Sequence, residues 1–578
     1  MLNQALEIFK EMYEKEGYGD RLILDSYIPS DGTYIIVIPY KDSFRVEEEI
    51  NIKYDKKIGD IDRTNKYMPF ICLADYYSIL ISTDKPIDKK KVILSNNYLS
   101  FIVKKENLKN TKLTVDIIDD YYSVLKNPVN KYKNNKKSLQ AYEALEKKLG
   151  EVNGELVSDI EKWIKDNLFK LLEDNDGKNY LKVFFYYPEE DYIKEGNRYY
   201  LTNIYNKNMY NIQIDRIIYG LPNNNMSLNA KKPYLENKSR KVEVPYLIDQ
   251  EEAILQKKLF DYLYNQACIY KNNIYIGEEI LAYKDGDSPN EKFDGIYLRI
   301  KKGKELEIND VDIVCGYNPR LNKSFEYKNV LGIDHEFLSD DYGGYSTKKG
   351  LEKIINSTFF NKMLISNYYT DVKDINIKEP TFKYRILESR NSLFNWFYKN
   401  NKAPCNLIKR LGFNLVVDSI RSGYIIKASN QFNLYGSFKD YFEEGVSMES
   451  NISQIKDILR KKVNTSCDLD LYIESDSEYF YAVGQLVNFF FSKDKSKKKN
   501  FSAINPFINS KKDNIIKSKL ELLFKKYNYD ISGKRFSSLY SMVLSYEPKM
   551  KINSDMIIAG FLNKCLIFEK ELEGVENE

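Results

Sequence analysis

The chain has 578 residues, a formal net charge of +4, 43% hydrophobic residues and 30% charged residues. These proportions are ordinary for a soluble globular protein, and the length predicts several domains with separate cores. The small net charge excludes a general nucleic-acid coat, so any basic site has to be a local patch. No apolar run approaches the ~20 residues that span a bilayer and the N-terminus lacks an export signal, so we expect a cytoplasmic protein without membrane contact.

The sequence lacks the catalytic and metal-binding motifs of several classes of enzyme. The six cysteines lie far apart with no C-x-x-C pair, and the one histidine, His335, cannot supply a zinc site or a histidine-based triad with a second histidine. There is no phosphate-binding P-loop and no G-x-G-x-x-G fingerprint. We therefore expect no metal and no cofactor.

The first predicted domain, 1–137, mixes helix and strand. Apolar residues recur at helical spacing near the N-terminus, and β-branched and aromatic runs follow. The elements expected are a helix from Leu2 to Tyr13, strands over 34–40 and 44–54, two short strand pieces within 93–105, and a helix over 118–125.

The second predicted domain, 138–440, begins with two helices and continues as a mixed α/β body. Trp163 lies on an apolar helical stripe, which favours a core position, and Ser158 with Glu161 has the spacing of a capping box. Further elements expected are strands over 180–187, 198–205, 209–220 and 295–314, and helices over 138–149, 250–270, 350–370 and 385–412.

From Met448 the strand pattern nearly vanishes, which predicts a C-terminal helical bundle over 448–578. The helices expected are 449–462, 478–492, 511–527, 535–546 and 554–572. Between Lys493 and Lys564, 16 basic residues face six acidic ones. The fold class predicted is thus α+β: a multidomain mixed α/β N-terminal body followed by an all-α bundle with a basic face.

One stretch differs from the rest: Gly220 to Ile248, GLPNNNMSLNAKKPYLENKSRKVEVPYLI, called here the recognition stretch. Its glycine, prolines and asparagines favour loop over regular structure. Because it is rich in amides and cations, it suits contact with a nucleic-acid backbone and with base edges. A solvated surface loop in a chain rich in asparagine and lysine explains the composition equally well.

The order of these blocks resembles the large subunit of the type I-B CRISPR interference complex (Cascade), in its Clostridium-like branch. The matching stretches are ADYYSILISTDKPIDKKKVILSNNYLSFIVKK (74–105), DDYYSVLKNPVNKYK (119–133), SLQAYEALEKKLGEVNGELVSDIEKWI (138–164) and GLPNNNMSLNAKKPYLENKSRK (220–241). The likeness covers most of the chain, and the last stretch is the most specific.

The resemblance implies a non-catalytic subunit in antiviral defence. It would read the protospacer-adjacent motif (PAM) on duplex DNA, help to open the duplex and stabilise the R-loop, while guide RNA pairing reads the target sequence. The partners implied are a guide RNA ribonucleoprotein with its backbone, guide-end and small subunits, the target double-stranded DNA with its displaced strand, and a separate helicase-nuclease.

Carried onto this chain, the resemblance divides the recognition stretch by role. The expected base-edge readers are Asn223, Asn224, Asn225 and Asn229, since an amide both donates and accepts hydrogen bonds. Met226 or Leu228 would separate the strands as an apolar wedge. The expected phosphate ligands are Lys231, Lys232, Lys238, Arg240 and Lys241.

The bundle resembles the part of this family that holds the displaced strand. The expected contacts are Lys497, Lys498, Lys499, Lys511, Lys512, Lys525, Lys526, Lys534 and Arg535. The codons that can encode Glu443–Val446 permit a ribosome-binding sequence just before the Met448 codon. Internal initiation is a theme of the family, so we predict a second product of 131 residues, Met448–Glu578.

Two alternatives stay open from the sequence. Asp312, Glu326 and Lys328 have the order of an Asp…Glu-x-Lys nuclease, which would use metal-assisted phosphodiester cleavage. Chance matches to that pattern are common in a chain rich in glutamate and lysine. A scaffolding protein without nucleic-acid contact is the other alternative.

Overall fold

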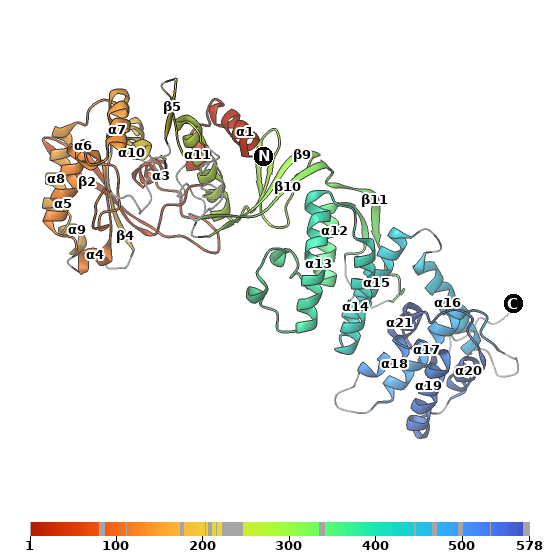
Figure 1. The fold of residues 1–578 in the computed structure, drawn as a ribbon. Helices are drawn as coiled ribbons and strands as arrows, with labels where there is room; N and C mark the ends of the chain where they lie inside the picture. The colour runs from red at the N-terminus through yellow and green to blue at the C-terminus, as the bar shows by residue number, and fades with distance from the viewer. Residues whose placement is uncertain are drawn as a thin grey trace. The chain divides into compact units, whose positions relative to one another are not determined.

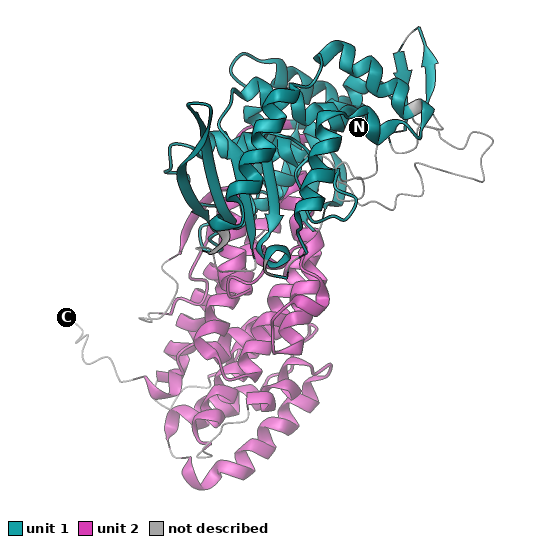
Figure 2. Ribbon diagram, turned by 90° about the vertical axis from the view of Figure 1, so that its left-hand side faces the viewer, with its two compact units in different colours: residues 1–285, 294–313 teal, residues 286–293, 314–578 magenta. Residues whose placement is uncertain are grey.

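The computed structural model describes most of the chain and divides it into two compact units (Figure 2). The described residues are 2–79, 87–110, 112–173, 179–202, 204–205, 211–215, 217–221, 247–303, 305–333, 341–443, 445, 447–464, 471–494, 501–531 and 533–569. Unit 1 comprises 1–285 and 294–313, and unit 2 comprises 286–293 and 314–578. The helical block expected to open a second domain at 138 therefore lies in one unit with the residues before it.

Unit 1 combines two four-stranded sheets with helices (Figure 1). Its strands are β1 (Gly32–Tyr40), β2 (Ser43–Ile52), β3 (Ser100–Lys104), β4 (Tyr180–Phe185), β5 (Ile212–Ile214), β6 (Ile217–Tyr219), β7 (Asn273–Ile276), β8 (Ile280–Tyr283), β9 (Phe293–Lys302) and β10 (Leu306–Tyr317), the last of which continues into unit 2. Its helices are α1 (Leu2–Glu14), α2 (Arg21–Leu24), α3 (Met68–Ser78), α4 (Lys105–Lys109), α5 (Val115–Lys126), α6 (Val129–Tyr132), α7 (Lys136–Leu149), α8 (Gly154–Asn167), α9 (Lys170–Glu173), α10 (Glu189–Thr202) and α11 (Gln250–Cys268).

The first sheet has the order β2-β1-β4-β3, with β1 and β4 parallel and the outer pairs antiparallel. The central strand β1 is a continuous apolar run that is buried from Gly32 to Val37, as expected for a strand covered on both faces. The edge strand β2 carries Glu47, Glu48 and Glu49, and such charges protect an open edge from pairing with other strands. The second sheet has the order β10-β9-β7-β8.

A buried ion pair ties α3 to the first sheet. Lys182 Nζ of β4 lies 2.5 Å from Asp75 Oδ1 of α3, and both side chains are at most 2% exposed. The hydroxyl of Tyr27 donates a further hydrogen bond to Asp75 at 2.9 Å. Burial lowers the pKa of Lys182, although Asp75 opposes this effect. Removing either partner would leave the other charge buried and unpaired.

Unit 2 begins with a short antiparallel pair and is helical afterwards (Figure 1). Its strands are β11 (Arg320–Tyr327) and β12 (Gly343–Thr347), and its helices are α12 (Lys348–Ile354), α13 (Pro380–Lys399), α14 (Cys405–Arg421), α15 (Ile425–Phe442), α16 (Met448–Asn464), α17 (Asp476–Ser492), α18 (Asn505–Ile508), α19 (Asp513–Tyr527), α20 (Lys534–Ser545) and α21 (Ser554–Leu562). The predicted class, α+β with an all-α C-terminal part, is confirmed. Among the described residues the last strand ends at Thr347, about 100 residues before Met448, where the sequence suggested the change.

The apolar helix α17 forms the centre of the C-terminal bundle, where it packs against α21. Two glycines allow this close approach. A Cβ on Gly484 would lie 2.1 Å from the Ile557 carbonyl oxygen, and one on Gly560 would lie 2.1 Å from that of Tyr481. Within the described ranges, no helix is both long enough and apolar enough to cross a membrane.

Several local predictions are wrong. The helix expected over 385–412 is interrupted between α13 and α14, and those expected over 350–370 and 554–572 end early, at Ile354 in α12 and at Leu562 in α21. The run at 198–205 was expected as a strand, but Arg198 to Thr202 is the end of α10, whose Tyr192, Gly196 and Tyr199 recur at helical spacing and are buried. Helix α8 is capped by Asn153, which accepts from the Leu156 amide at 3.1 Å, rather than by Ser158. The hydroxyl of Ser158 donates to the Gly154 carbonyl within the helix at 2.8 Å.

The core position predicted for Trp163 is confirmed. Its side chain is buried among the apolar residues of unit 1, and its indole nitrogen donates to the Phe44 carbonyl at 3.1 Å. The supposed capping residue Glu161 instead pairs with Lys126 at 2.6 Å and with Lys165 at 2.7 Å. The bond to Lys126 joins α8 to the neighbouring helix α5, whereas the bond to Lys165 lies within α8.

Candidate nucleic-acid interface

The two ends of the recognition stretch meet at a single point in unit 1. The Gly220 amide donates to the Ile248 carbonyl at 2.9 Å, and the Ile248 amide donates to the Gly220 carbonyl at 3.1 Å. The neighbouring Leu221 and Ile248 side chains are buried. The described residues that flank 222–246 in the sequence are therefore joined by one antiparallel bridge, called here the root.

A tyrosine ring fills the space beside the root. A Cβ on Gly220 would lie 2.4 Å from Cγ of Tyr205, so glycine is needed for this contact. The ring cannot turn away freely because Tyr205 is buried and its hydroxyl donates to the Ile218 carbonyl at 2.7 Å. The root is thus held from the side as well as by its own two hydrogen bonds.

A small hairpin, β5–β6, directly precedes the root (Figure 1). Its isoleucines Ile212, Ile214, Ile217 and Ile218 are between 36% and 52% exposed, although β-branched apolar residues are usually buried. The sequence predicted strands in 209–220, but apolar alternation cannot show that a two-stranded hairpin has no covering layer. The polar recognition stretch thus begins next to an exposed apolar surface.

On its other side the root continues into α11, which is fixed to two further helices. Asp249 caps α11 by accepting from the Glu252 amide at 2.8 Å. Lys258 of α11 lies 2.7 Å from Asp20, which also accepts hydrogen bonds from the hydroxyls of Tyr13 and Tyr77. Burial alone would raise the pKa of Asp20, but the charge of Lys258 and these hydrogen bonds lower it below the ordinary value. The ionised carboxylate therefore anchors the helix on which the recognition stretch ends.

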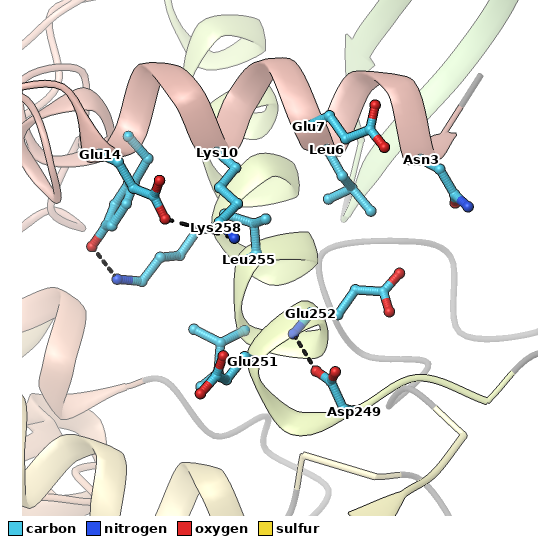
Figure 3. A pocket seen from close by; sticks show the side chains of 12 residues that line it. Asn3, Leu6, Glu7, Lys10, Glu14, Asp249, Glu251, Glu252, Leu255 and Lys258 are labelled. Carbon is cyan, nitrogen blue, oxygen red and sulfur yellow. Dashed lines mark hydrogen bonds and ion pairs between the residues drawn. The ribbon is translucent and has the colours of Figure 1, made fainter. Parts of the chain in front are cut away.

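A pocket of about 570 Å³ lies between α1 and α11, next to the root (Figure 3). Leu6, Ile254 and Leu255 provide its apolar lining, and its charged lining residues are Glu7, Lys10, Glu14, Asp249, Glu251, Glu252 and Lys258. Burial and then the charge of Asp249 raise the pKa of Glu252. Five carboxylates against two cations would repel a phosphate, so this pocket is unsuited to the nucleic-acid backbone.

Most of the predicted contacts lie outside the described residues. These are Asn223, Asn224, Asn225, Met226, Leu228, Asn229, Lys231, Lys232, Lys238, Arg240 and Lys241 of the recognition stretch, and Lys497, Lys498 and Lys499 of the bundle. His335 also lies outside them. Their assignments stay predictions.

The other predicted bundle cations lie around α19. Lys511 and Lys512 precede this helix, Lys525 and Lys526 end it, and Lys534 begins α20; all five are exposed. The two ends of α19 are about 20 Å apart at 1.5 Å per residue. A charged surface of this length suits an extended polyanion strand.

Arg535 differs from these lysines. Its guanidinium donates to the Glu569 carbonyl, and its side chain is partly buried. Lys526 lies 4.6 Å from the ring centre of Tyr527, whose side chain is buried. The exposed lysines are therefore better placed than Arg535 for contact with a strand.

The residues of the nuclease alternative have separate local partners. Glu326 accepts from the Ser324 hydroxyl at 3.0 Å, and Lys328 lies 3.4 Å from Glu449. Asp312 accepts from the Ile313 amide at 2.9 Å. In the described part of the chain, no three His, Cys, Asp or Glu side chains gather in a group that could hold a metal.

Met448, the predicted internal start, is the first residue of α16. Its amide donates to Asp440 Oδ1 at 2.8 Å, and the Ser447 hydroxyl donates to Asp440 Oδ2 at 3.0 Å. The helix therefore begins where the predicted product begins, but its N-terminal cap comes from α15.

No protein-family model, curated protein or solved structure matches this chain. Any assignment of function therefore depends on its own residues. Two features bear on it: a polar, cationic stretch whose end residues, Gly220 and Ile248, are joined at the root, and a helical bundle with exposed lysines around α19.

Proposed function

We propose that this chain is the non-catalytic large subunit of a type I-B CRISPR RNA-guided surveillance complex. It reads the PAM on duplex DNA, helps to open the duplex, stabilises the R-loop and supports recruitment of a separate helicase-nuclease. Its direct partners are the guide RNA ribonucleoprotein with its backbone, guide-end and small subunits, and the target DNA.

The observation that carries the proposal is the composition of the recognition stretch together with its root. Residues 222–246 contain five asparagines and five cations against two acids. Both ends are held by the bridge from Gly220 to Ile248, and α11 is anchored through Lys258. A fixed base lets a polar stretch of this length be presented to DNA at reduced entropic cost.

The proposed mechanism separates gripping from reading. Lysine and arginine side chains neutralise phosphates, which brings the complex onto duplex DNA without regard to sequence. Asparagine amides then test base edges, where a good contact is worth about 1–3 kcal/mol against a wrong base. Met226 or Leu228 supports strand separation at the motif. After opening, the exposed lysines around α19 hold the displaced strand.

The test is binding of the assembled complex to a library of flanking motifs. Changing Asn224 and Asn225 to alanine should flatten the motif preference by about 5- to 150-fold for each base that is no longer read. Asn237→Ala, in the same stretch but without an assigned role, is the matched control. Unchanged motif preference in the Asn224/Asn225 variant would refute the assignment.

Two further outcomes would overturn the proposal as a whole. If charge reversal at Lys231 and Lys232 leaves the salt dependence of DNA binding unchanged, these lysines do not hold DNA phosphates and the scaffolding alternative survives. If the isolated chain cleaves DNA with magnesium and Asp312→Asn abolishes cleavage, the chain is a nuclease.

Silent recoding of Glu444 and Gly445 should abolish the product that begins at Met448, and a persisting band would refute internal initiation there.

A further inference from the structure

The last described residue of the bundle, Glu569, is fixed by two arginines. The guanidinium of Arg460, in α16, holds both carboxylate oxygens of Glu569, at 2.8 and 3.2 Å. Arg535, in the first turn of α20, donates to the Glu569 backbone carbonyl. Residues 570–578 therefore start from a defined place beside the beginning of α20.

An aromatic cluster joins this place to three helices of the bundle (Figure 1). Phe568, which precedes Glu569, has its ring centre 5.3 Å from that of Phe489 in α17. Phe489 lies 4.9 Å from Phe536 in α20, and Phe536 lies 6.0 Å from Phe524 in α19. The last turns of α17 and α19 and the first turn of α20 therefore meet near Glu569.

Four lysines surround the aromatic cluster and are called here the basic end: Lys493, Lys525, Lys526 and Lys534. Lys493 lies 5.2 Å from the ring centre of Phe489, and the other three follow Phe524 or precede Phe536 by one or two residues and are exposed. Among the residues that the structure describes, none of the four forms an ion pair with a carboxylate. Asp494 acts on Lys526 through its charge, without such a pair.

The residues that follow Glu569 in the sequence carry the opposite charge. Residues 570–578, KELEGVENE, contain four glutamates and one lysine and lie outside the described residues. Nine residues span at most about 30 Å. Successive ring centres on the way from Phe568 to Phe524 are only 4.9 to 6.0 Å apart, so every lysine of the basic end is within reach.

We infer that residues 570–578, called here the acidic segment, bind the basic end and compete there with a single nucleic-acid strand. Attachment at Glu569 gives the acidic segment an effective concentration in the millimolar range at these lysines. Each exposed ion pair contributes a factor of only about 1.4 to 5 to the binding equilibrium. A strand that offers many phosphates can therefore displace the acidic segment.

The identity of the competing strand rests on the proposed function, in which the lysines around α19 hold displaced DNA. Binding of the acidic segment depends only on residues of this chain. Before the duplex opens, the acidic segment occupies the basic end and screens it from unrelated nucleic acid. The displaced strand replaces the segment because the complex presents that strand at high local concentration.

The first measurement tests binding of the acidic segment in the full chain without nucleic acid. The segment variant is Glu571→Gln, Glu573→Gln, Glu576→Gln and Glu578→Gln. The control variant changes four exposed glutamates of unit 1, so that the net charge changes equally: Glu11→Gln, Glu16→Gln, Glu143→Gln and Glu151→Gln. Brief acetylation followed by mass spectrometry reports each lysine, because an ion pair lowers the fraction of neutral, reactive amine.

Lys525, Lys526 and Lys534 should be acetylated about threefold faster or more in the segment variant, since three exposed pairs together contribute at least about that factor. The control variant should react like wild type. Lys549 and Lys551, which are exposed and belong to the loop before α21, should react equally in all three proteins.

The second measurement is the affinity of the full chain for a thymidine oligonucleotide of about 20 residues, longer than a typical single-strand site. At low salt the segment variant should bind about 3- to 140-fold more tightly than wild type. Its slope of log K against log salt should be steeper by about 0.7 for each lysine released to a phosphate. In a background with Lys525→Gln, Lys526→Gln and Lys534→Gln, neutralising the acidic segment should have no further effect, whereas Lys→Arg changes at these three positions should preserve it.

Equal acetylation of the three lysines in wild type and segment variant would overturn the inference. So would a gain in affinity equal to that of the control variant, or one that persists without the three lysines, because the gain would then reflect net charge alone. Faster acetylation with unchanged affinity would refute competition with a strand. Failure of the proposed function is visible separately: the wild-type complex would show no motif preference, whatever the acetylation pattern.

Discussion

Replacing Gly220 with alanine tests whether the root controls recognition. The new Cβ would lie 2.4 Å from Cγ and 2.5 Å from Cδ1 of Tyr205, well inside contact distance. The ring is buried and its hydroxyl is bonded to the Ile218 carbonyl, so the clash has to be relieved by moving the ring or by opening the bridge to Ile248. Overpacking of this kind typically costs about 1–3 kcal/mol.

At about 1.4 kcal/mol per factor of ten, this cost would make the open root about 5 to 150 times more populated. Hydrogen exchange of the Ile248 amide, which donates to Gly220, reports that opening directly. Exchange should accelerate at Ile248 and Gly220, while amides of the central strand β1 stay protected. DNA binding by the complex should weaken although none of the residues proposed to contact DNA is changed.

A second substitution decides whether the ring is the obstacle. Tyr205→Val removes the ring, so Gly220→Ala should cost much less in that background, with a coupling of about 1 kcal/mol or more. Gly154→Ala is the control, because a Cβ there meets nothing within 4 Å. Additive effects of Gly220→Ala and Tyr205→Val, or unchanged exchange at Ile248, would refute this account of the root.

Three further predictions concern the scaffold. Gly484→Ala should destabilise the contact of α17 with α21 by more than about 1–3 kcal/mol, because the new Cβ would lie 2.1 Å from a backbone atom. Limited proteolysis of the variant should cut unit 2 first, and a cleavage pattern unchanged from wild type would contradict this prediction. Asp75→Asn should lower the free energy of unfolding of unit 1 in urea by about 3–5 kcal/mol, because Lys182 would be left buried without its counter-charge. A loss of unfolding free energy below about 1 kcal/mol would show that the pair is not tightly packed. Burial lowers the pKa of Lys348 to about 8, so between about pH 8 and 10.5 the unfolded chain binds one proton more than the folded chain, and this residue should make wild type more stable as the pH rises through that range. In thermal unfolding at pH 7 and pH 10, Lys348→Met should remove this contribution to the pH dependence of stability. An equal pH dependence in wild type and variant would contradict the assignment.

Sequence patterns predicted the elements well where burial follows a single period. The apolar run of β1 and the helical stripe that includes Trp163 are such cases, and both have the expected structure. The sequence patterns gave a wrong prediction at 198–205, where tyrosine, threonine and isoleucine favour strand by composition. There the buried face is set by tertiary contact: Gly196 lies against the Tyr77 carbonyl, where a Cβ would approach to 2.4 Å.

The candidate site was only partly open to prediction for a different reason. Polar composition identified the recognition stretch, but the root depends on pairing of Gly220 with Ile248 and on the ring of Tyr205, which no local pattern encodes. Contacts between distant segments are the part that sequence periodicity does not contain.

The path of the chain between the units has a consequence for its synthesis. The short segment 286–293 belongs to unit 2, although the residues on both sides of it, up to 313, belong to unit 1. Asp287 pairs with Lys349 at 2.6 Å, and the Gly286 amide donates to the Tyr398 hydroxyl at 2.9 Å. At ribosomal rates of about 5–20 residues per second, Tyr398 is made roughly 6 to 22 s after Gly286. Throughout that interval the segment exists without its final partner, so a pause in translation between these codons would prolong the time for which a nascent chain can bind a chaperone or be cut by a protease there.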